Sequence, residues 1–227
     1  MGDHSVYPRN SLASLMKSLT LNTDGTEFDI QLTSDNVLVA FHDEDLSWST
    51  NMRGIVRNHT YDELKNASYK YGPYNTFKIV SVEKLFEQAY NKRDARFSLD
   101  CKLYSSQNDR SYYTDFVYAL KSLMKKFNVP DRLDVESSDP DFLKLVKENV
   151  NDIGTYFYAN DAVSGTEICS LYRLTGISIS NTLITADEVK AAHEKGYKVI
   201  LWDVHSKSDH ESALRKYADM IQSDDLR

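Results

Sequence analysis

The chain has 227 residues, of which 41% are hydrophobic and 27% charged, a balance typical of a folded globular protein and not of a disordered one. This length is enough for one sizeable core, and we expect a single domain over residues 1–227. The net charge of −7 argues against nucleic-acid binding, which needs a basic surface. Against this negative charge, an anionic substrate would require a local metal ion or cation.

Along the chain, apolar β-rich runs alternate with amphipathic helical patterns. The expected strands are Gly25–Leu32, Ala95–Leu103, Arg132–Ser137, Ile153–Tyr158, Gly176–Ser180, Lys198–Val204 and Ala218–Ser223. The expected helices are Ser11–Leu19, Ser81–Asn91, Asp109–Phe127, Asp139–Glu148, Ala162–Leu174, Ala186–Lys195 and Ser208–Tyr217. Helix-capping residues support these boundaries, with Asp139 and Thr185 at helix starts and Gly196 at a helix end. This alternation predicts a parallel sheet in an α/β fold.

Seven strands are one fewer than the eight that close a TIM (β/α)8 barrel. The chain opens on a loop and a helix, so we expect the first strand to be missing from this chain.

The segment Gly25–His42 is expected to form an antiparallel hairpin within this pattern. With Asp35 and Asn36 as the two central turn residues, Asp29 would lie opposite His42. The two faces would then separate into an apolar set (Ile30, Leu32, Val39 and Phe41) and a polar set (Glu27, Asp29, Gln31 and His42).

Glu27 and Asp29 are two residues apart, so both carboxylates project from the same side of the strand. Converging oxygen ligands suit a hard divalent cation, Ca2+ or Mg2+, although a solvated strand face is the alternative. His42 stands beside Asp43, and a histidine held by a carboxylate can transfer protons; a structural histidine is the other interpretation.

A second pair of polar residues closes the strand Ala95–Leu103. Asp100 and Lys102 fall on one face, where Asp100 could complete a metal site and Lys102 could neutralise a phosphoryl oxygen. An ordinary salt bridge between the two is equally compatible with this segment. The ends of barrel strands are nevertheless where barrel enzymes place their sites.

The segment Gly25–Asp43 resembles the signature of the glycerophosphodiester phosphodiesterase family, whose members are TIM barrels similar to phosphatidylinositol phospholipase C. Further similar segments follow in order: Thr50–Gly54, Thr60–Leu64, Phe97–Lys102, Glu136–Pro140, Ala191–Gly196, Val199–Val204 and Ala218–Asp224. The resemblance covers nearly the whole chain.

The resemblance implies hydrolysis of a small-molecule glycerophosphodiester to glycerol phosphate and an alcohol. It assigns one divalent cation, Ca2+ or Mg2+, to Glu27, Asp29 and Asp100, and one of two catalytic histidines to His42. The resemblance also implies that Lys102 contacts phosphate and Trp202 packs against the glycerol moiety. In the family's route the 2-hydroxyl of the substrate attacks phosphorus, and water then opens the cyclic product.

The sequence departs from the family pattern at three places. Asp100 stands where the family usually has glutamate, and Arg9 stands where it has the glutamate of Pro-Glu-Asn-Thr. The family's first strand ends in His-Arg-Gly, of which only Gly2 is matched, so the first catalytic histidine would lie upstream of Met1 or be replaced. His4 is a candidate for that role, although we favour a loop position for it.

Two other functions stay open from the sequence: a phospholipase-type diesterase acting on lipid headgroups, and an inactive barrel that binds phosphodiesters. No apolar run approaches the ~20 residues of a membrane span. We therefore expect a soluble protein, cytoplasmic as given and extracytoplasmic if a signal peptide was removed upstream of Met1. Cys101 and Cys169 are expected to be buried thiols. The alcohol, the metal and the oligomeric state are not determined by the sequence.

Overall fold

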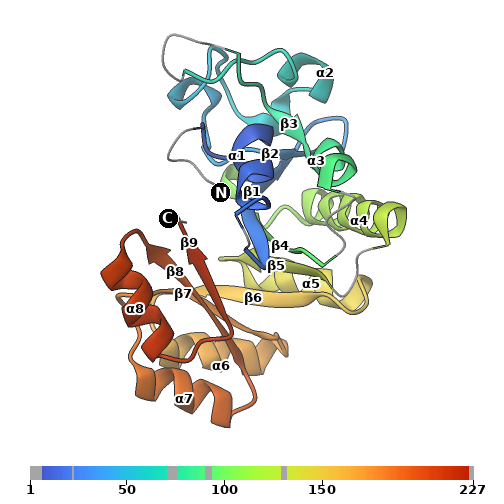
Figure 1. Ribbon diagram of the computed structural model, residues 1–227. Coiled ribbons are helices and arrows are strands. Elements are labelled where there is room, and N and C mark those ends of the chain that lie inside the picture. Colours follow the sequence, from blue (N-terminus) through green and yellow to red (C-terminus); the bar gives the residue numbers. More distant parts are fainter. Residues whose placement is uncertain (1–6, 22, 71–75, 90–93, 129–131, 225–227) are drawn as a thin grey trace. The chain divides into compact units, whose positions relative to one another are not determined.

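A computed structural model describes residues 7–21, 23–70, 76–89, 94–128 and 132–224 (Figure 1). The chain divides into two compact units, residues 1–133 and 134–227. The prediction of a single domain over the whole chain stays a prediction. Each unit has its own strands and its own covering helices.

The first unit contains a strand pair that carries most of the predicted site residues. Its elements are α1 (Leu12–Ser18), β1 (Gly25–Leu32), β2 (Leu38–Ala40), η1 (Leu46–Trp48), η2 (Val56–Asn58), α2 (Tyr61–Leu64), β3 (Val80–Ser81), α3 (Val82–Ala89), β4 (Arg96–Cys101), η3 (Tyr104–Ser106) and α4 (Arg110–Phe127). The strand order is β3-β2-β1-β4; β1 and β4 are parallel, whereas β2 is antiparallel to both of its neighbours. Gly25 starts β1 close to β4, since a Cβ there would lie 2.1 Å from the carbonyl oxygen of Arg96.

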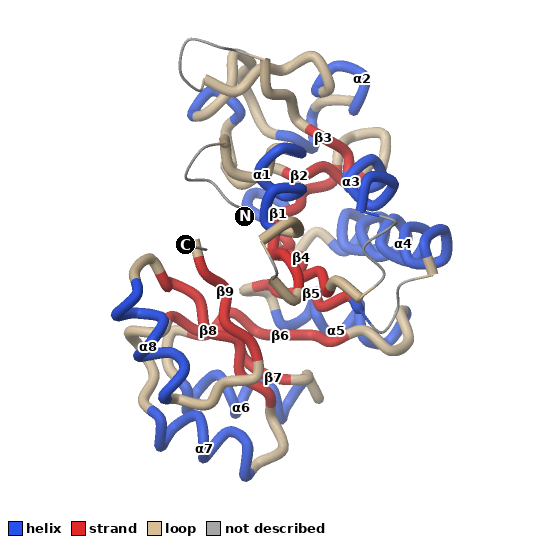
Figure 2. The backbone as a smooth tube through the Cα atoms, viewed as in Figure 1, coloured by secondary structure: helices blue, strands red, loops and turns tan. Residues whose placement is uncertain are grey.

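The second unit alternates strands and helices. Its elements are β5 (Leu133–Ser137), α5 (Pro140–Asn149), β6 (Gly154–Ala159), α6 (Ala162–Tyr172), β7 (Gly176–Ser180), α7 (Ala186–Glu194), β8 (Lys198–Val204), α8 (Lys207–Arg215) and β9 (Met220–Ser223). The strands pair in chain order, and every pair is parallel. Short strands and helices alternate along this unit, which is the pattern of repeated β–α units (Figure 2).

All seven expected strands and all seven expected helices occur, with ends within two residues of the predicted ones. The caps act as expected: Asp139 accepts a hydrogen bond from the N–H of Phe142, and Thr185 forms a capping box with Glu188. Gly196 follows α7 with φ of +83°, a conformation that glycine adopts without strain.

The predicted hairpin is present, but its predicted register is wrong by one residue. Ile30 pairs with Ala40 and Leu32 with Leu38, so paired numbers sum to 70 and not to 71. The loop has three residues between Thr33 and Val37, and Asn36 adopts a left-handed φ of 62°. Phe41, and not His42, therefore lies opposite Asp29, with its N–H bonded to the carbonyl of Asp29 at 3.0 Å.

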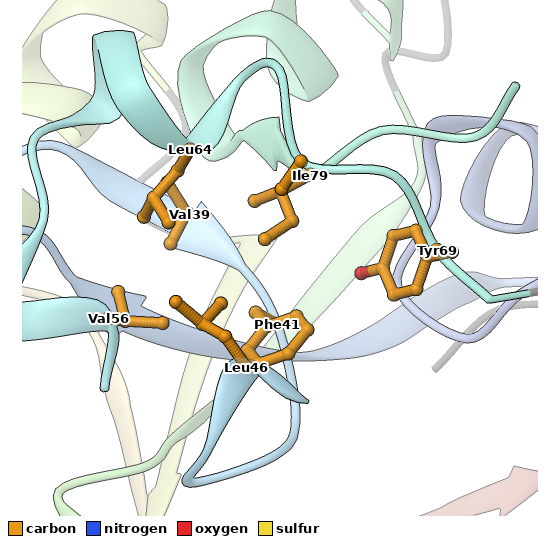
Figure 3. Packing of buried hydrophobic residues seen from close by; sticks show 8 residues of the cluster. Val39, Phe41, Leu46, Val56, Leu64, Tyr69 and Ile79 are labelled. Carbon is orange, nitrogen blue, oxygen red and sulfur yellow. The ribbon is translucent and has the colours of Figure 1, made fainter. Parts of the chain in front are cut away.

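This register also corrects the predicted separation of faces. Val39 and Phe41 pack into a cluster with side chains from the segment between β2 and β3, not with Ile30 and Leu32. Figure 3 shows these side chains pointing toward one another around Phe41. The cluster consists of Val39, Phe41, Leu46, Val56, Leu64, Ala67, Tyr69 and Ile79. Burial of this cluster anchors residues 44–70 and 76–79 on the hairpin strand that leads to His42.

The two cysteines are buried free thiols, as predicted. Burial raises the pKa of the Cys169 thiol to about 12, so it has little thiolate character at neutral pH. Among the described residues, no helix combines the length and the apolar character that crossing a membrane requires.

Candidate metal and active site

Three carboxylates from β1 and β4 converge at one place in the first unit. Asp29 is the register partner of Asp100, so the two side chains leave neighbouring strands side by side. Glu27 lies two residues before Asp29 on the same side of β1. One oxygen of each of the three lies within 4.8 Å of the others. The structure therefore brings together the three residues that were predicted to bind metal.

This arrangement fits a divalent cation. An ion with ligand distances of about 2.0–2.6 Å can hold oxygens that are up to roughly 5 Å apart. The negative charges of the three carboxylates also exceed the single positive charge of Lys102, whose ammonium group bridges two of them. Although aspartate stands where the family uses glutamate, the shorter side chain of Asp100 reaches the cluster. Oxygen donors of this kind suit Ca2+ or Mg2+.

Lys102 joins Asp29 and Asp100. Its Nζ lies 3.1 Å from Oδ1 of Asp29 and 2.6 Å from Oδ2 of Asp100. Burial alone would lower the pKa of Lys102, but the two carboxylates outweigh it and raise the pKa above the usual value. The ammonium thus stays charged. The salt bridge to Asp100, which the sequence left open as an alternative to a phosphate contact, is present, and it leaves a positive charge next to the cluster.

The two aspartates differ in their response to this environment. Burial tends to raise the pKa of Asp29, but Lys102, His42 and a hydrogen bond from Asn10 together bring it below the usual value. Burial raises the pKa of Asp100, and the charge of Asp29 adds to the increase, which Lys102 only partly offsets. Asp100 is therefore the member of the pair that takes up a proton first.

Asn10 is a site residue that sequence reasoning did not assign. Its Nδ2 donates to Oδ2 of Asp29 at 2.8 Å, and its Oδ1 accepts the N–H of Asp29 at 3.1 Å. Asn10 is buried and has a left-handed φ of 58°, a conformation that asparagine tolerates better than most residues. Its position in the segment that resembles Pro-Glu-Asn-Thr was the available signal.

His42 follows the hairpin and is half-buried, with 42% of its side chain exposed. Its Nδ1 lies 2.9 Å from Oδ1 of Asp43. If Nδ1 carries the proton of that hydrogen bond, Nε2 is the nitrogen left for proton transfer. His42 is also close enough to influence the pKa values of Asp29 and Asp100.

The remaining predicted residues lie elsewhere. Trp202 belongs to β8 of the second unit, where its ring stacks on Tyr158 with centroids 4.9 Å apart and planes inclined by 22°. Its role as a substrate contact stays a prediction. His4 lies outside the described residues. Because residues 1–6 are not described, the expectation that the first strand is missing from this chain stays a prediction.

Comparisons with known proteins identify relatives of this chain. The model of the glycerophosphoryl diester phosphodiesterase family matches residues 2–227. A glycerophosphodiester phosphodiesterase of Bacillus altitudinis is 30% identical over 134 residues, which are 58% of this chain and 53% of that protein, so the chain spans about half of that relative's length. One of Caldanaerobacter subterraneus subsp. tengcongensis is 26% identical over 99% of this chain and 91% of that protein.

A solved structure has the same fold. The Oleispira antarctica phosphodiesterase in complex with the product sn-glycerol-3-phosphate superposes with a TM-score of 0.86 at 21% identity, over 98% of this chain and 90% of that one. This likeness confirms the predicted fold class, an α/β fold of the TIM-barrel type.

Proposed function

Because the chain belongs to the glycerophosphoryl diester phosphodiesterase family, we propose that it hydrolyses glycerophosphodiesters to glycerol phosphate and an alcohol with the help of one divalent cation. The observation that carries this proposal is the convergence of Glu27, Asp29 and Asp100 beside Lys102. The named activity of relatives and the product bound to the Oleispira antarctica phosphodiesterase support the substrate class.

Each of the predicted site residues has a role in this proposal. Glu27, Asp29 and Asp100 would hold Ca2+ or Mg2+, which when bound polarises a phosphoryl oxygen. His42 would transfer a proton through Nε2 while Asp43 orients its ring. Lys102 would place its positive charge against the negative charge that develops on the phosphoryl group. Trp202 would pack against the glycerol moiety, and a second proton-transfer group, for which His4 is the candidate, would complete the reaction.

The test is an assay of the purified chain on glycerophosphocholine and glycerophosphoethanolamine, with release of glycerol phosphate as the signal. We expect turnover with Ca2+ or Mg2+ and its loss after chelation. His42→Ala should lower kcat by roughly 10²-fold or more while the protein stays folded. His59→Ala is a matched control, because His59 contacts the Arg53 carbonyl and Glu63 instead of the site.

Turnover that is unaffected by chelation, or unaffected by His42→Ala, would contradict the proposal. Cleavage of phospholipid vesicles in preference to the soluble diesters would favour the phospholipase-type alternative. Cation-dependent binding of the diesters without turnover would identify an inactive binding barrel.

A further inference from the structure

The main chain around His42 is held by side chains from two other elements. Regular pairing of β2 with β1 ends at Ala40, and one further main-chain bond joins Phe41 to Asp29. From there the carbonyl groups of residues 41–43 point to side chains. The Nε2 of Gln31 donates to the carbonyl of Phe41 at 3.0 Å and to that of Asp43 at 2.9 Å.

The carbonyl between these two belongs to His42 itself, and it accepts the hydroxyl hydrogen of Tyr104. Three consecutive carbonyls are thus held by Gln31 from β1 and Tyr104 from the turn after β4. Gln31 is 5% exposed, so both of its bonds are made in a water-poor place, where a lost partner is costly. The imidazole of His42 is carried by a peptide segment with little freedom to move.

Tyr104 reaches His42 from an unfavourable backbone conformation. Its φ is 35°, a left-handed value that residues with a large side chain rarely adopt. Such strain persists only where surrounding contacts enforce it, and it concentrates at functional sites. Tyr104 also follows Lys102 by two residues. One short segment therefore positions both the ammonium group of Lys102 and the Tyr104 hydroxyl that donates to the carbonyl of His42.

Arg57 of η2 holds the turn that bears Tyr104. Its two terminal nitrogens donate to Oγ of Ser106 at 2.7 Å and to Oδ2 of Asp109 at 3.0 Å, and its guanidinium lies 4.7 Å from the ring centre of Tyr112. A planar guanidinium with three partners fixes a loop better than a single ion pair does.

From these contacts we propose that Gln31 and Tyr104 are positioning residues for His42: they hold the peptide groups on both sides of it and thereby fix its imidazole against the acidic cluster. The inference rests on the proposed diesterase function. Its physical basis is that proton transfer requires a defined geometry, and a displacement of about 1 Å can cost on the order of 10²-fold in rate. Neither residue touches the reacting atoms in this account, so both act through His42.

The kinetic test uses Gln31→Leu and Tyr104→Phe, which remove the donors but keep most of the side-chain volume. We expect each to lower kcat about 10-fold with KM and cation affinity within about twofold of wild type. Tyr61→Phe is the matched control, because its hydroxyl accepts a main-chain bond from Ser81 and contacts neither the His42 segment nor the turn that bears Tyr104. In a His42→Ala background, Tyr104→Phe should have no further effect on the residual rate.

A second measurement does not depend on activity. In NMR spectra of the histidine ring protons, we expect the His42 signal to shift or split in Gln31→Leu and in Tyr104→Phe, and to stay as in the wild type in Tyr61→Phe. This arm decides the inference even if the wild type has no diesterase activity, an outcome that would refute only the proposed function.

The positioning role is refuted by an unchanged His42 signal in both variants. It is also refuted if Tyr104→Phe lowers the residual rate of His42→Ala as much as it lowers the wild-type rate, since the loss would then not pass through His42.

Discussion

Two hydrogen bonds join Asn10 and Asp29. The Nδ2 of Asn10 donates to Oδ2 of Asp29 at 2.8 Å, and the main-chain N–H of Asp29 donates to Oδ1 of Asn10 at 3.1 Å. This pair joins the segment before α1 to the centre of the acidic cluster. It uses both functional groups of the asparagine side chain, so it fixes the orientation of the carboxylate and also its position.

Replacement of Asn10 by alanine should therefore destabilise the protein. Asn10→Ala leaves the N–H and one carboxylate oxygen of buried Asp29 without these partners, for a loss of about 1–3 kcal/mol in the free energy of unfolding. Alanine also tolerates the left-handed φ less well than asparagine does. Asn10→Gly, which removes the amide but relieves the backbone, should lose less. Chemical denaturation measures both, and wild-type stability in both variants would contradict the prediction.

Binding of a cation to the cluster should stabilise the folded chain. At a Ca2+ or Mg2+ concentration about 100 times Kd, the gain is about 2.7 kcal/mol and appears as a higher Tm. Asp100→Asn should abolish this increase, because it removes one of the three carboxylates. The exposed carboxylate of Asp62 offers a control, and Asp62→Asn should keep the wild-type response. An equal increase in Asp100→Asn would exclude the site.

The raised pKa of Asp100 makes cation binding depend on pH. The carboxyl must lose its proton before it can bind the ion, and low pH favours the protonated form. Affinity should therefore fall as pH decreases, starting at a higher pH than for an ordinary aspartate. The stability of the metal-free protein should change with pH in the opposite direction. Because the pKa of Asp100 is raised in the folded state, this group stabilises the fold at low pH, and the contribution is lost as pH rises through the folded-state pKa.

Isothermal titration in two buffers with different ionisation enthalpies measures the protons released on cation binding. We expect release to increase from neutral to mildly acidic pH. Heats that are independent of the buffer over this range would show that Asp100 is already fully ionised.

Tyr69 offers a prediction about stability alone. Its hydroxyl is buried in the cluster around Phe41 and has no hydrogen-bond partner among the residues that the structure describes (Figure 3). Burial, with the charges of Asp43 and Asp29, raises the pKa of this hydroxyl, so it stays neutral. Tyr69→Phe removes a buried polar atom without breaking a bond and should be neutral or stabilising by up to about 1 kcal/mol.

Tyr113→Phe, which removes the acceptor of the Asn108 N–H, should instead cost about 1 kcal/mol. Comparison of the two Tm values checks the pair, and an equal loss in both would mean that the Tyr69 hydroxyl has a partner in solution.

The elements and the acidic pair could be predicted because they depend on local patterns. The alternation of strands and helices follows from periodicity and capping, and the spacing of Glu27 and Asp29 alone places both on one side of a strand. Asp100 and Lys102 could be placed at a strand end, but the choice between a salt bridge and a phosphate contact could not be made from that segment. The structure shows that Lys102 bridges two carboxylates.

The register of the hairpin could not be predicted in the same way. The segment Thr33–Val37 is compatible with a two-residue or a three-residue loop, and the choice depends on the backbone conformation of Asn36, which no pattern in the side chains specifies. Asn10 and Tyr104 were missed for a related reason: their partners are distant in the sequence, and both have left-handed φ values that depend on the surrounding fold.

The three-residue loop after β1 has a consequence for how this family member can vary. Ser34, Asp35 and Asn36 are exposed, and exposed loops usually tolerate insertions and deletions. Here, a change of one residue in loop length would move Phe41 and His42 by one place along β1, turning the cluster side chains of β2 away from their neighbours. The length of this surface turn is therefore constrained by the packing of β2 and by the position of His42, which lies two residues beyond that strand.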